Sequence, residues 1–143
     1  MTAVSADLAE NLTVDGPSAR FTYRRIGPRG GVPLVMLQRF RGTVDWWDPE
    51  LLDRLAADHD VITFDNVGTG DTTGDPRSSV EGLADGAGAE FVDALGLEQV
   101  DLLGWTLGCD ASARTANSFI VPMTQSFAVL ATRGSDTLAT SVG

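Results

Sequence analysis

The sequence predicts an α/β fold in which helices cover both faces of a mostly parallel sheet, with an antiparallel hairpin at the amino-terminal end. Three short, mostly apolar segments, residues 33–37, 61–65 and 99–103, are typical of strands buried on both faces. Stretches with helical character separate these segments, and such alternation favours parallel pairing. Residues 11–14 and 20–26 instead alternate in polarity around a turn, which predicts the hairpin.

The connecting segments carry start and stop signals for two helices. Asp48 followed by Pro49 is a typical helix start, with Asp as N-cap and Pro at the first helical position. Residues 66–79 are rich in Gly, Thr and Asp and predict a long loop. A second helix is expected over residues 80–95, weakened by three internal glycines, and Gly96 is a suitable C-cap.

The last third of the chain is less well specified. Residues 111–118 can form a helix and residues 126–132 a strand, which we expect to be parallel to the strand before it. Nothing is periodic after that point. We therefore expect a flexible start over residues 1–10, one partial core domain over residues 11–132, and a frayed tail over residues 133–143.

Composition restricts the classes of partner and the cellular compartment. The chain has 143 residues, enough for one domain with a core, and its formal net charge is −10. This charge argues against binding to nucleic acid or to an anionic membrane surface. One cysteine excludes an internal disulfide and fits a reducing cytosol. With no signal peptide and no apolar run near ~20 residues, we expect a cytoplasmic protein.

The segment most specific for function is Val-Asp-Leu-Leu-Gly-Trp-Thr-Leu-Gly at residues 100–108. Here an apolar run enters Gly-x-Thr-x-Gly, and the flanking Gly104 and Gly108 permit a tight strand-to-helix turn around Thr106. This is the pattern of a nucleophile elbow, with threonine in place of serine. The pattern is short, and an ordinary strand, turn and helix cap is the alternative interpretation.

Two further motifs precede this turn in a characteristic order. The strand at residues 33–37 runs into Gln-Arg-Phe-Arg-Gly, and the strand at residues 61–65 runs into Asp-Asn-Val-Gly-Thr-Gly. With the turn at residues 104–108, the chain resembles the α/β-hydrolase family over about residues 20–132. In that family one strand ends in His-Gly or a variant, the next in Asp-x-x-Gly-x-Gly, and a third enters the elbow. The resemblance implies the amino-terminal two thirds of the fold, a truncated α/β-hydrolase core without its carboxy-terminal part.

The resemblance also implies a reaction and a set of site residues. The family hydrolyses small esters, lactones and related acyl compounds without a metal or a cofactor, so a small ester-like molecule would be the substrate. By correspondence, Thr106 occupies the nucleophile position, and the backbone amides of Leu107 and Phe40 form the oxyanion hole. The methyl group of threonine crowds this turn, so a structural role for Thr106 is the alternative.

The general base is the missing component. The one histidine, His59, precedes the strand at residues 61–65 and should lie at the amino end of the sheet. A five-residue strand spans about 16 Å, so His59 cannot reach Thr106. In the family, the acid and the histidine follow later strands than those predicted here. We therefore expect a weak or inactive hydrolase, or alternatively a non-catalytic truncated binding or assembly module, unless another polypeptide supplies the missing half.

Other candidate sites are weaker. Asp65 and Asp71 flank the glycine loop, and Asp65 is expected to brace it. Cys109 is most simply a small buried thiol. Residues 68–74 are similar to a dinucleotide-binding loop, but the third glycine is one residue late and Asp71 would face the pyrophosphate. The spacing of Asp65, Asp71 and Asp75 matches no calcium loop. No cofactor and no metal are therefore expected.

The predicted strand at residues 126–132 also suggests an association surface. It carries no charged residue, and the neighbouring strand of the complete family is not expected in this chain. An open apolar strand edge recruits another chain unless charge or a bulge blocks it. We therefore expect self-association, or a partner chain, at this edge.

Overall fold

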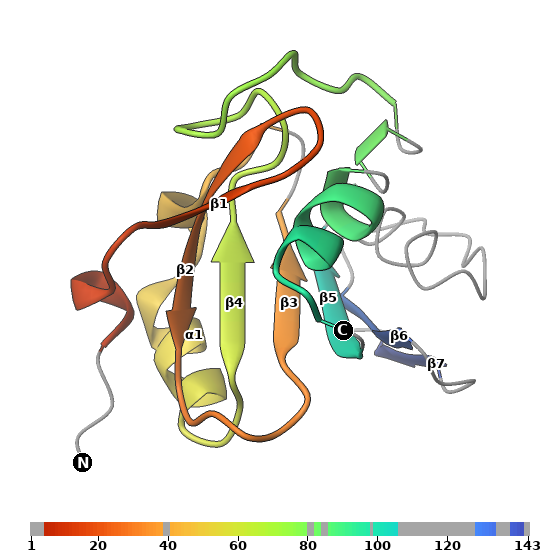
Figure 1. Ribbon diagram of the computed structural model, residues 1–143. Coiled ribbons are helices and arrows are strands. Elements are labelled where there is room, and N and C mark those ends of the chain that lie inside the picture. Colours follow the sequence, from red (N-terminus) through yellow and green to blue (C-terminus); the bar gives the residue numbers. More distant parts are fainter. Residues whose placement is uncertain are drawn as a thin grey trace.

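A computed structural model describes residues 5–38, 41–79, 82–83, 86–97, 99–105, 128–133 and 138–141 (Figure 1). The strands are β1 (Leu12–Asp15), β2 (Arg20–Ile26), β3 (Leu34–Leu37), β4 (Val61–Phe64), β5 (Val100–Trp105), β6 (Ala128–Arg133) and β7 (Leu138–Ser141). The helical segments are η1 (Ala6–Leu8), η2 (Val44–Trp46), α1 (Pro49–Ala56) and η3 (Gly86–Val92). None of the helices in these ranges is long and apolar enough to cross a membrane.

The strands form one mixed sheet in the order β1-β2-β4-β3-β5-β6-β7. The central strand β3 is parallel to both β4 and β5, with Leu34 opposite Val61 on one side and opposite Asp101 on the other. β1 and β2 form the predicted antiparallel hairpin, and β2 pairs antiparallel with β4. The predicted α/β class is confirmed. We call the edge at which β3, β4 and β5 end the carboxyl edge.

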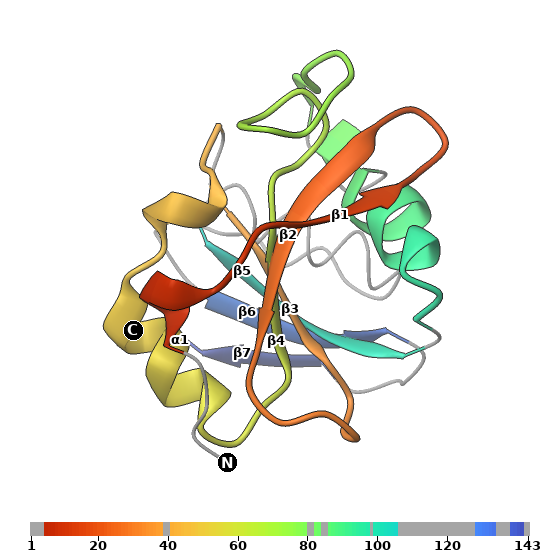
Figure 2. The same cartoon turned by 60° about the vertical axis from the view of Figure 1, so that its left-hand side comes forward.

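Two hydrophobic clusters lie on opposite faces of the sheet, as the alternation of side chains along a strand requires. On one face, Val35 and Ile62 belong to the cluster that includes Phe91 of η3. On the other face, Met36 and Val61 pack in the cluster that includes Leu52 of α1. Figure 2 shows α1 and η3 on the two sides of the sheet. Both faces are apolar, which explains the continuous apolar runs of the central strands.

Helix α1 begins where the sequence predicts. The side chain of Asp48 accepts a hydrogen bond from the backbone N–H of Glu50 at 2.9 Å, and Pro49 occupies the first turn. The helix buries Leu52 and Ala56 against the sheet and ends at Ala56. Its N-terminus thus follows from local capping and its orientation from two apolar positions four residues apart.

The second helix differs from the prediction in its geometry. Over the described residues of this region, Gly86–Val92 forms a π-helical segment, which is a rare form of helix. Gly86 lies so close to the glycine loop that an added Cβ would be 2.2 Å from Asn66 Oδ1. Gly96 has a φ of +71° and terminates the segment as predicted, with its N–H donating to Asp93 O at 3.0 Å.

The largest correction concerns the last two strands. β6 is antiparallel to β5, with Leu102 opposite Ala131, and not parallel as expected. β7 pairs with the other edge of β6, with Ala131 opposite Leu138. Antiparallel strands can be joined by a short connection, and only residues 134–137 separate β6 from β7. The open edge predicted at residues 126–132 is therefore wrong, because β6 pairs on both sides. β7 lies within the residues expected to form the tail, and self-association remains a prediction.

Two other expectations concern the start of the chain and residues 111–118. The start was expected to be flexible over residues 1–10, but Ala6 is buried and its N–H donates to Asp53 Oδ1 of α1 at 2.7 Å. The helix expected over residues 111–118 lies outside the described residues. The division into a start, a core and a tail remains a prediction.

The aromatic cluster under η3 gives the first testable prediction. Phe91 has no exposed surface and stacks on Phe64 with ring centroids 4.2 Å apart. Phe91→Ala should lower the free energy of unfolding by about 3–5 kcal/mol, because it removes buried surface and leaves a cavity. The control Leu51→Ala, at a position 41% exposed, should change it by less than about 0.5 kcal/mol. Equal effects in urea denaturation would contradict this packing.

Candidate active site at the carboxyl edge

The carboxyl edge brings the ends of the three motif-bearing strands together. Leu37, the last residue of β3, is paired with Gly104 of β5. β3 and β5 therefore end at neighbouring positions on this edge. The predicted site residues Thr106, Leu107 and Phe40 lie outside the described residues, so their roles remain predictions. Cys109 also lies outside that part of the chain.

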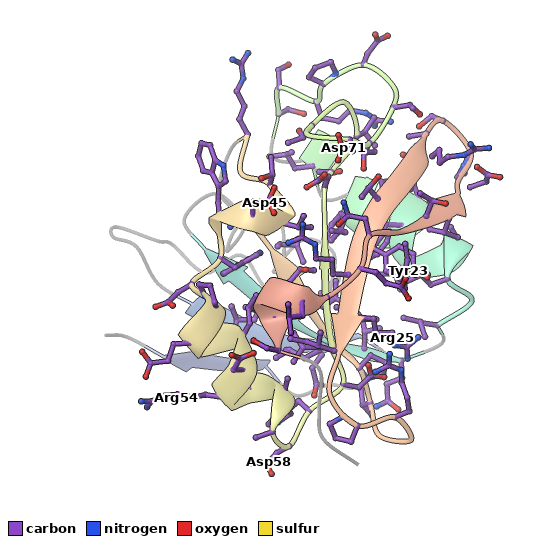
Figure 3. All side chains as sticks on the ribbon, turned by 90° about the vertical axis from the view of Figure 1, so that its left-hand side faces the viewer. Tyr23, Arg25, Asp45, Arg54, Asp58 and Asp71 are labelled. Atoms are coloured by element: carbon purple, nitrogen blue, oxygen red, sulfur yellow. The ribbon has the colours of Figure 1, made fainter. Side chains whose placement is uncertain are left out.

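His59 lies at the opposite edge of the sheet, as predicted. It is exposed, it precedes β4, and its Nδ1 is 3.1 Å from Leu55 O at the end of α1. Figure 3 shows the neighbouring Asp58 at the far end of the molecule from Asp45 and Asp71 of the carboxyl-edge loops. The length of β4 separates His59 from the candidate site, so this histidine cannot be its general base.

Asp65 is the buried polar residue at the carboxyl edge. It follows β4, is 2% exposed, and accepts two backbone hydrogen bonds through different oxygens. Oδ2 accepts from the N–H of Asp71 at 3.1 Å, which confirms the predicted brace within the glycine loop. Oδ1 accepts from the N–H of Val44 at 2.9 Å. The bond to Val44 was not predicted, because no local pattern links residues so far apart in sequence.

The spacing of Asp-x-x-Gly-x-Gly has a steric explanation. Gly70 has a φ of +55° and lies against the carboxylate, where an added Cβ would be 2.4 Å from Asp65 Oδ2. Gly68 has a φ of +71°, and an added Cβ would be 2.3 Å from the backbone nitrogen of Pro76. Both positions favour glycine for its conformational freedom and its small size. The glycine loop therefore wraps closely around the buried carboxylate.

Thr72 attaches the glycine loop to the hairpin. Its Oγ1 donates to Asp65 O at 2.7 Å and accepts from the N–H of Thr22 in β2 at 2.9 Å. The N–H of Asp65 donates to Thr22 O at 3.0 Å. This role of Thr72 was not predicted, and the available signal in the sequence was two adjacent threonines inside a glycine-rich loop. The base of the loop is thus fixed to a strand of the sheet.

The loop after β3 is held at several points. Thr43 Oγ1 accepts from the N–H of Asp45 at 3.3 Å and caps η2. Asp45 Oδ1 pairs with Arg24 Nη2 of β2 at 2.7 Å. Val44 and Trp47 are buried, and Val44 also donates to Asp65 as described above. Residues 43–47 are therefore attached to both β2 and the end of β4.

The electrostatic environment of Asp65 is unfavourable for its charge. Burial raises the pKa of this carboxyl above the ordinary value, and it is the largest cause. The N–H groups of Val44 and Asp71 act in the opposite direction, because they stabilise the ionised form. The nearby carboxylates of Asp71 and Asp45 raise the pKa further.

Within the described ranges, no three Asp, Glu, His or Cys side chains are grouped to hold a metal ion.

The raised pKa predicts a specific pH dependence of stability. The folded protein binds the Asp65 proton more tightly than the unfolded chain does. The contribution of this group to stability is therefore complete below the ordinary aspartate pKa of about 3.9 and is lost as the pH rises through the raised pKa. The stability of the wild type relative to Asp65→Asn should fall across that window in urea titrations.

Asp58→Asn is the matched control, since it removes one exposed carboxylate at the opposite edge. If the wild type gains stability relative to Asp65→Asn as the pH rises, the assigned direction of the pKa shift is wrong.

Comparisons with known proteins agree with this geometry. No family model matches the chain. Over 80 residues the chain is 35% identical to the candidate carbamate hydrolase RutD of Azorhizobium caulinodans, covering 54% of this chain and 29% of that protein. An α/β-hydrolase-fold protein from Chitinophaga pinensis superposes with a TM-score of 0.76 and 32% identity, covering 80% of this chain and 41% of the other.

Two further solved structures share the fold. ALR0039, described as an α/β hydrolase candidate from Nostoc sp PCC 7120, has a TM-score of 0.64 and 28% identity, covering 78% of this chain and 39% of its own. Naproxen esterase from Bacillus subtilis has a TM-score of 0.63 at 16% identity, covering 75% and 38%, and shows the fold alone. The chain spans less than half the length of each of these relatives. The chain is therefore an α/β-hydrolase-fold protein that carries part of that fold.

Proposed function

We propose that this chain is the nucleophile-bearing part of an α/β hydrolase that cleaves small ester, lactone or carbamate substrates. Thr106 would occupy the nucleophile position, and the backbone amides of Leu107 and Phe40 would stabilise the oxyanion. The observation that carries this proposal is the pairing of Leu37 with Gly104 at the ends of parallel strands. This pairing starts the two segments that contain the proposed residues from neighbouring points on the carboxyl edge.

The chemistry assigned to these residues follows from what acyl transfer requires. A hydroxyl oxygen attacks the carbonyl carbon, and the carbonyl oxygen acquires negative charge that two N–H donors stabilise. Backbone amides provide these donors whatever the side chain, so replacement of serine by threonine leaves them in place. A serine hydroxyl still fits such a turn more easily than a threonine hydroxyl, which carries a crowding methyl group.

The proposed catalytic machinery lacks a base. The one histidine of the sequence is His59, which lies at the opposite edge and contacts Leu55. Without a base, the hydroxyl of Thr106 remains protonated near pH 7. We therefore propose weak or no turnover through Thr106 in this chain by itself, with oxyanion stabilisation as the main remaining contribution.

A non-catalytic binding or assembly module is the second candidate. The position of His59 favours it, because a protein without a base can still bind an ester-like molecule at the same edge. The two candidates differ in whether the chain accelerates ester hydrolysis at all. For the compartment, the single cysteine of the sequence fits a reducing environment, and we propose the cytoplasm.

The proposed function predicts a distinctive pattern of p-nitrophenyl acetate hydrolysis. The wild-type chain should exceed the buffer rate but be no faster than Thr106→Ala, because the hydroxyl is not activated. Thr106→Ser should gain little, since it supplies a nucleophile and no base. Phe40→Pro, which removes one proposed oxyanion N–H, should reduce the remaining acceleration by about 100-fold, or to the buffer rate.

His59→Ala is the control and should not change any of these rates. Circular dichroism should verify that Phe40→Pro remains folded. Acceleration that is absent from the wild type, or unaffected by Phe40→Pro, would exclude the hydrolase proposal and leave the binding module. A large gain with Thr106→Ser that His59→Ala abolishes would show that the assigned separation is wrong.

A further inference from the structure

Asp65 joins two loops that are distant in sequence. Its carboxylate lies at the end of β4, between the loop after β3 and the glycine loop after β4. Oδ1 accepts from the N–H of Val44 at 2.9 Å, and Oδ2 accepts from the N–H of Asp71 at 3.1 Å. Each oxygen therefore serves one loop, and the side chain connects them through a position that is 2% exposed.

The connection is geometrically restrictive. Gly70 packs against the carboxylate on the Oδ2 side, where an added Cβ would be 2.4 Å from Oδ2, so little space remains for the carboxylate there. The main chain of Asp65 is also held, because its carbonyl accepts from Thr72 and its N–H donates to Thr22 O. The position of the Val44 N–H is thus set by the glycine loop and by the end of β4.

Val44 is the first residue of η2 and lies four positions after Phe40. Its side chain is buried, and the preceding Thr43 is extended, with φ −110° and ψ 174°. Residues 38–43 therefore connect two attached points, Leu37 in the sheet and Val44 at Asp65. Phe40 lies between these two fixed points.

We propose that Asp65 is a positioning residue, whose carboxylate holds the loop after β3 at Val44 and thereby positions the amide N–H that the proposed function assigns to Phe40. This inference depends on the proposed function for the role of Phe40, but the attachment of Val44 does not. Asp65 acts through the loop and does not touch the substrate. If Asp65 only braced the glycine loop, its replacement would affect Asp71 and leave Val44 unaffected.

Asp65→Asn tests this role with little change of shape. A carboxamide can accept from one of the two N–H groups, but its NH₂ would face the other, so at least one attachment is lost. Val44→Pro removes the other partner of the same bond. Proline is tolerated at the first helical position, and an extended residue before it is compatible, so this variant should fold.

Thr72→Val is the matched structural control. It removes the hydroxyl bonds to Asp65 O and to the N–H of Thr22 but leaves both carboxylate bonds in place. It should lower stability while leaving the loop after β3 in position. Comparison with this variant separates positioning by the carboxylate from general destabilisation of the edge.

The measurement is NMR of the 143-residue chain, with amide exchange and the position of the Phe40 amide cross-peak as readouts. Asp65→Asn should reduce exchange protection at Val44 or Asp71 by about 10- to 100-fold. Both Asp65→Asn and Val44→Pro should shift the Phe40 cross-peak, and Thr72→Val should leave it in place. The oxyanion-dependent ester hydrolysis should fall in the two former variants through kcat, with KM little changed.

The outcomes separate this inference from the proposed function. A Phe40 cross-peak that is unchanged in both Asp65→Asn and Val44→Pro, or that shifts equally in Thr72→Val, overturns the positioning role. Absence of hydrolysis in the wild type would count against the proposed function alone, because the Phe40 and Val44 signals would still decide whether Asp65 positions the loop.

Discussion

The carboxyl edge of this protein depends on one buried carboxylate. Asp65 closes β4, and its two oxygens fix the loop after β3 and the loop after β4 relative to each other. Its carbonyl and N–H are held by Thr72 and Thr22, so the hairpin β1-β2 belongs to the same unit. Gly68 and Gly70 allow the chain to turn tightly around this group. The loops at this edge are therefore connected to one another and to the sheet through one residue.

A second buried aspartate at the other end of β4 shows that the two edges are stabilised differently. Asp60 receives a bidentate contact from Arg25, at 2.9 and 2.6 Å, and Arg29 lies 3.3 Å from Oδ1. The described partners of the Asp65 carboxylate are instead neutral backbone N–H groups. Burial, which these N–H groups offset only in part, raises its pKa and lowers stability near neutral pH. Such a cost is common where geometry serves a site and not stability.

Local patterns in the sequence were sufficient to predict the features that a few adjacent residues determine. The cap at Asp48, the turn of the hairpin and the C-cap at Gly96 each follow from a few adjacent residues, and all three are present. The antiparallel pairing of β6 and the π-helical η3 were not predicted, because both depend on contacts across the fold. The bond from Val44 to Asp65 belongs to the same class. Sequence resemblance suggested Thr106, Leu107 and Phe40, which the described residues do not include.

The central claim is that the segments after β3 and β5 meet to form an oxyanion site at the carboxyl edge. The most direct test is a crystal structure that resolves residues 38–48 and 104–110. The amide nitrogens of Phe40 and Leu107 should both lie about 3 Å from a single point beside Thr106 Oγ1. A structure with Thr106 in the middle of a helix, or with these two amides directed to different sides of the sheet, would contradict the claim.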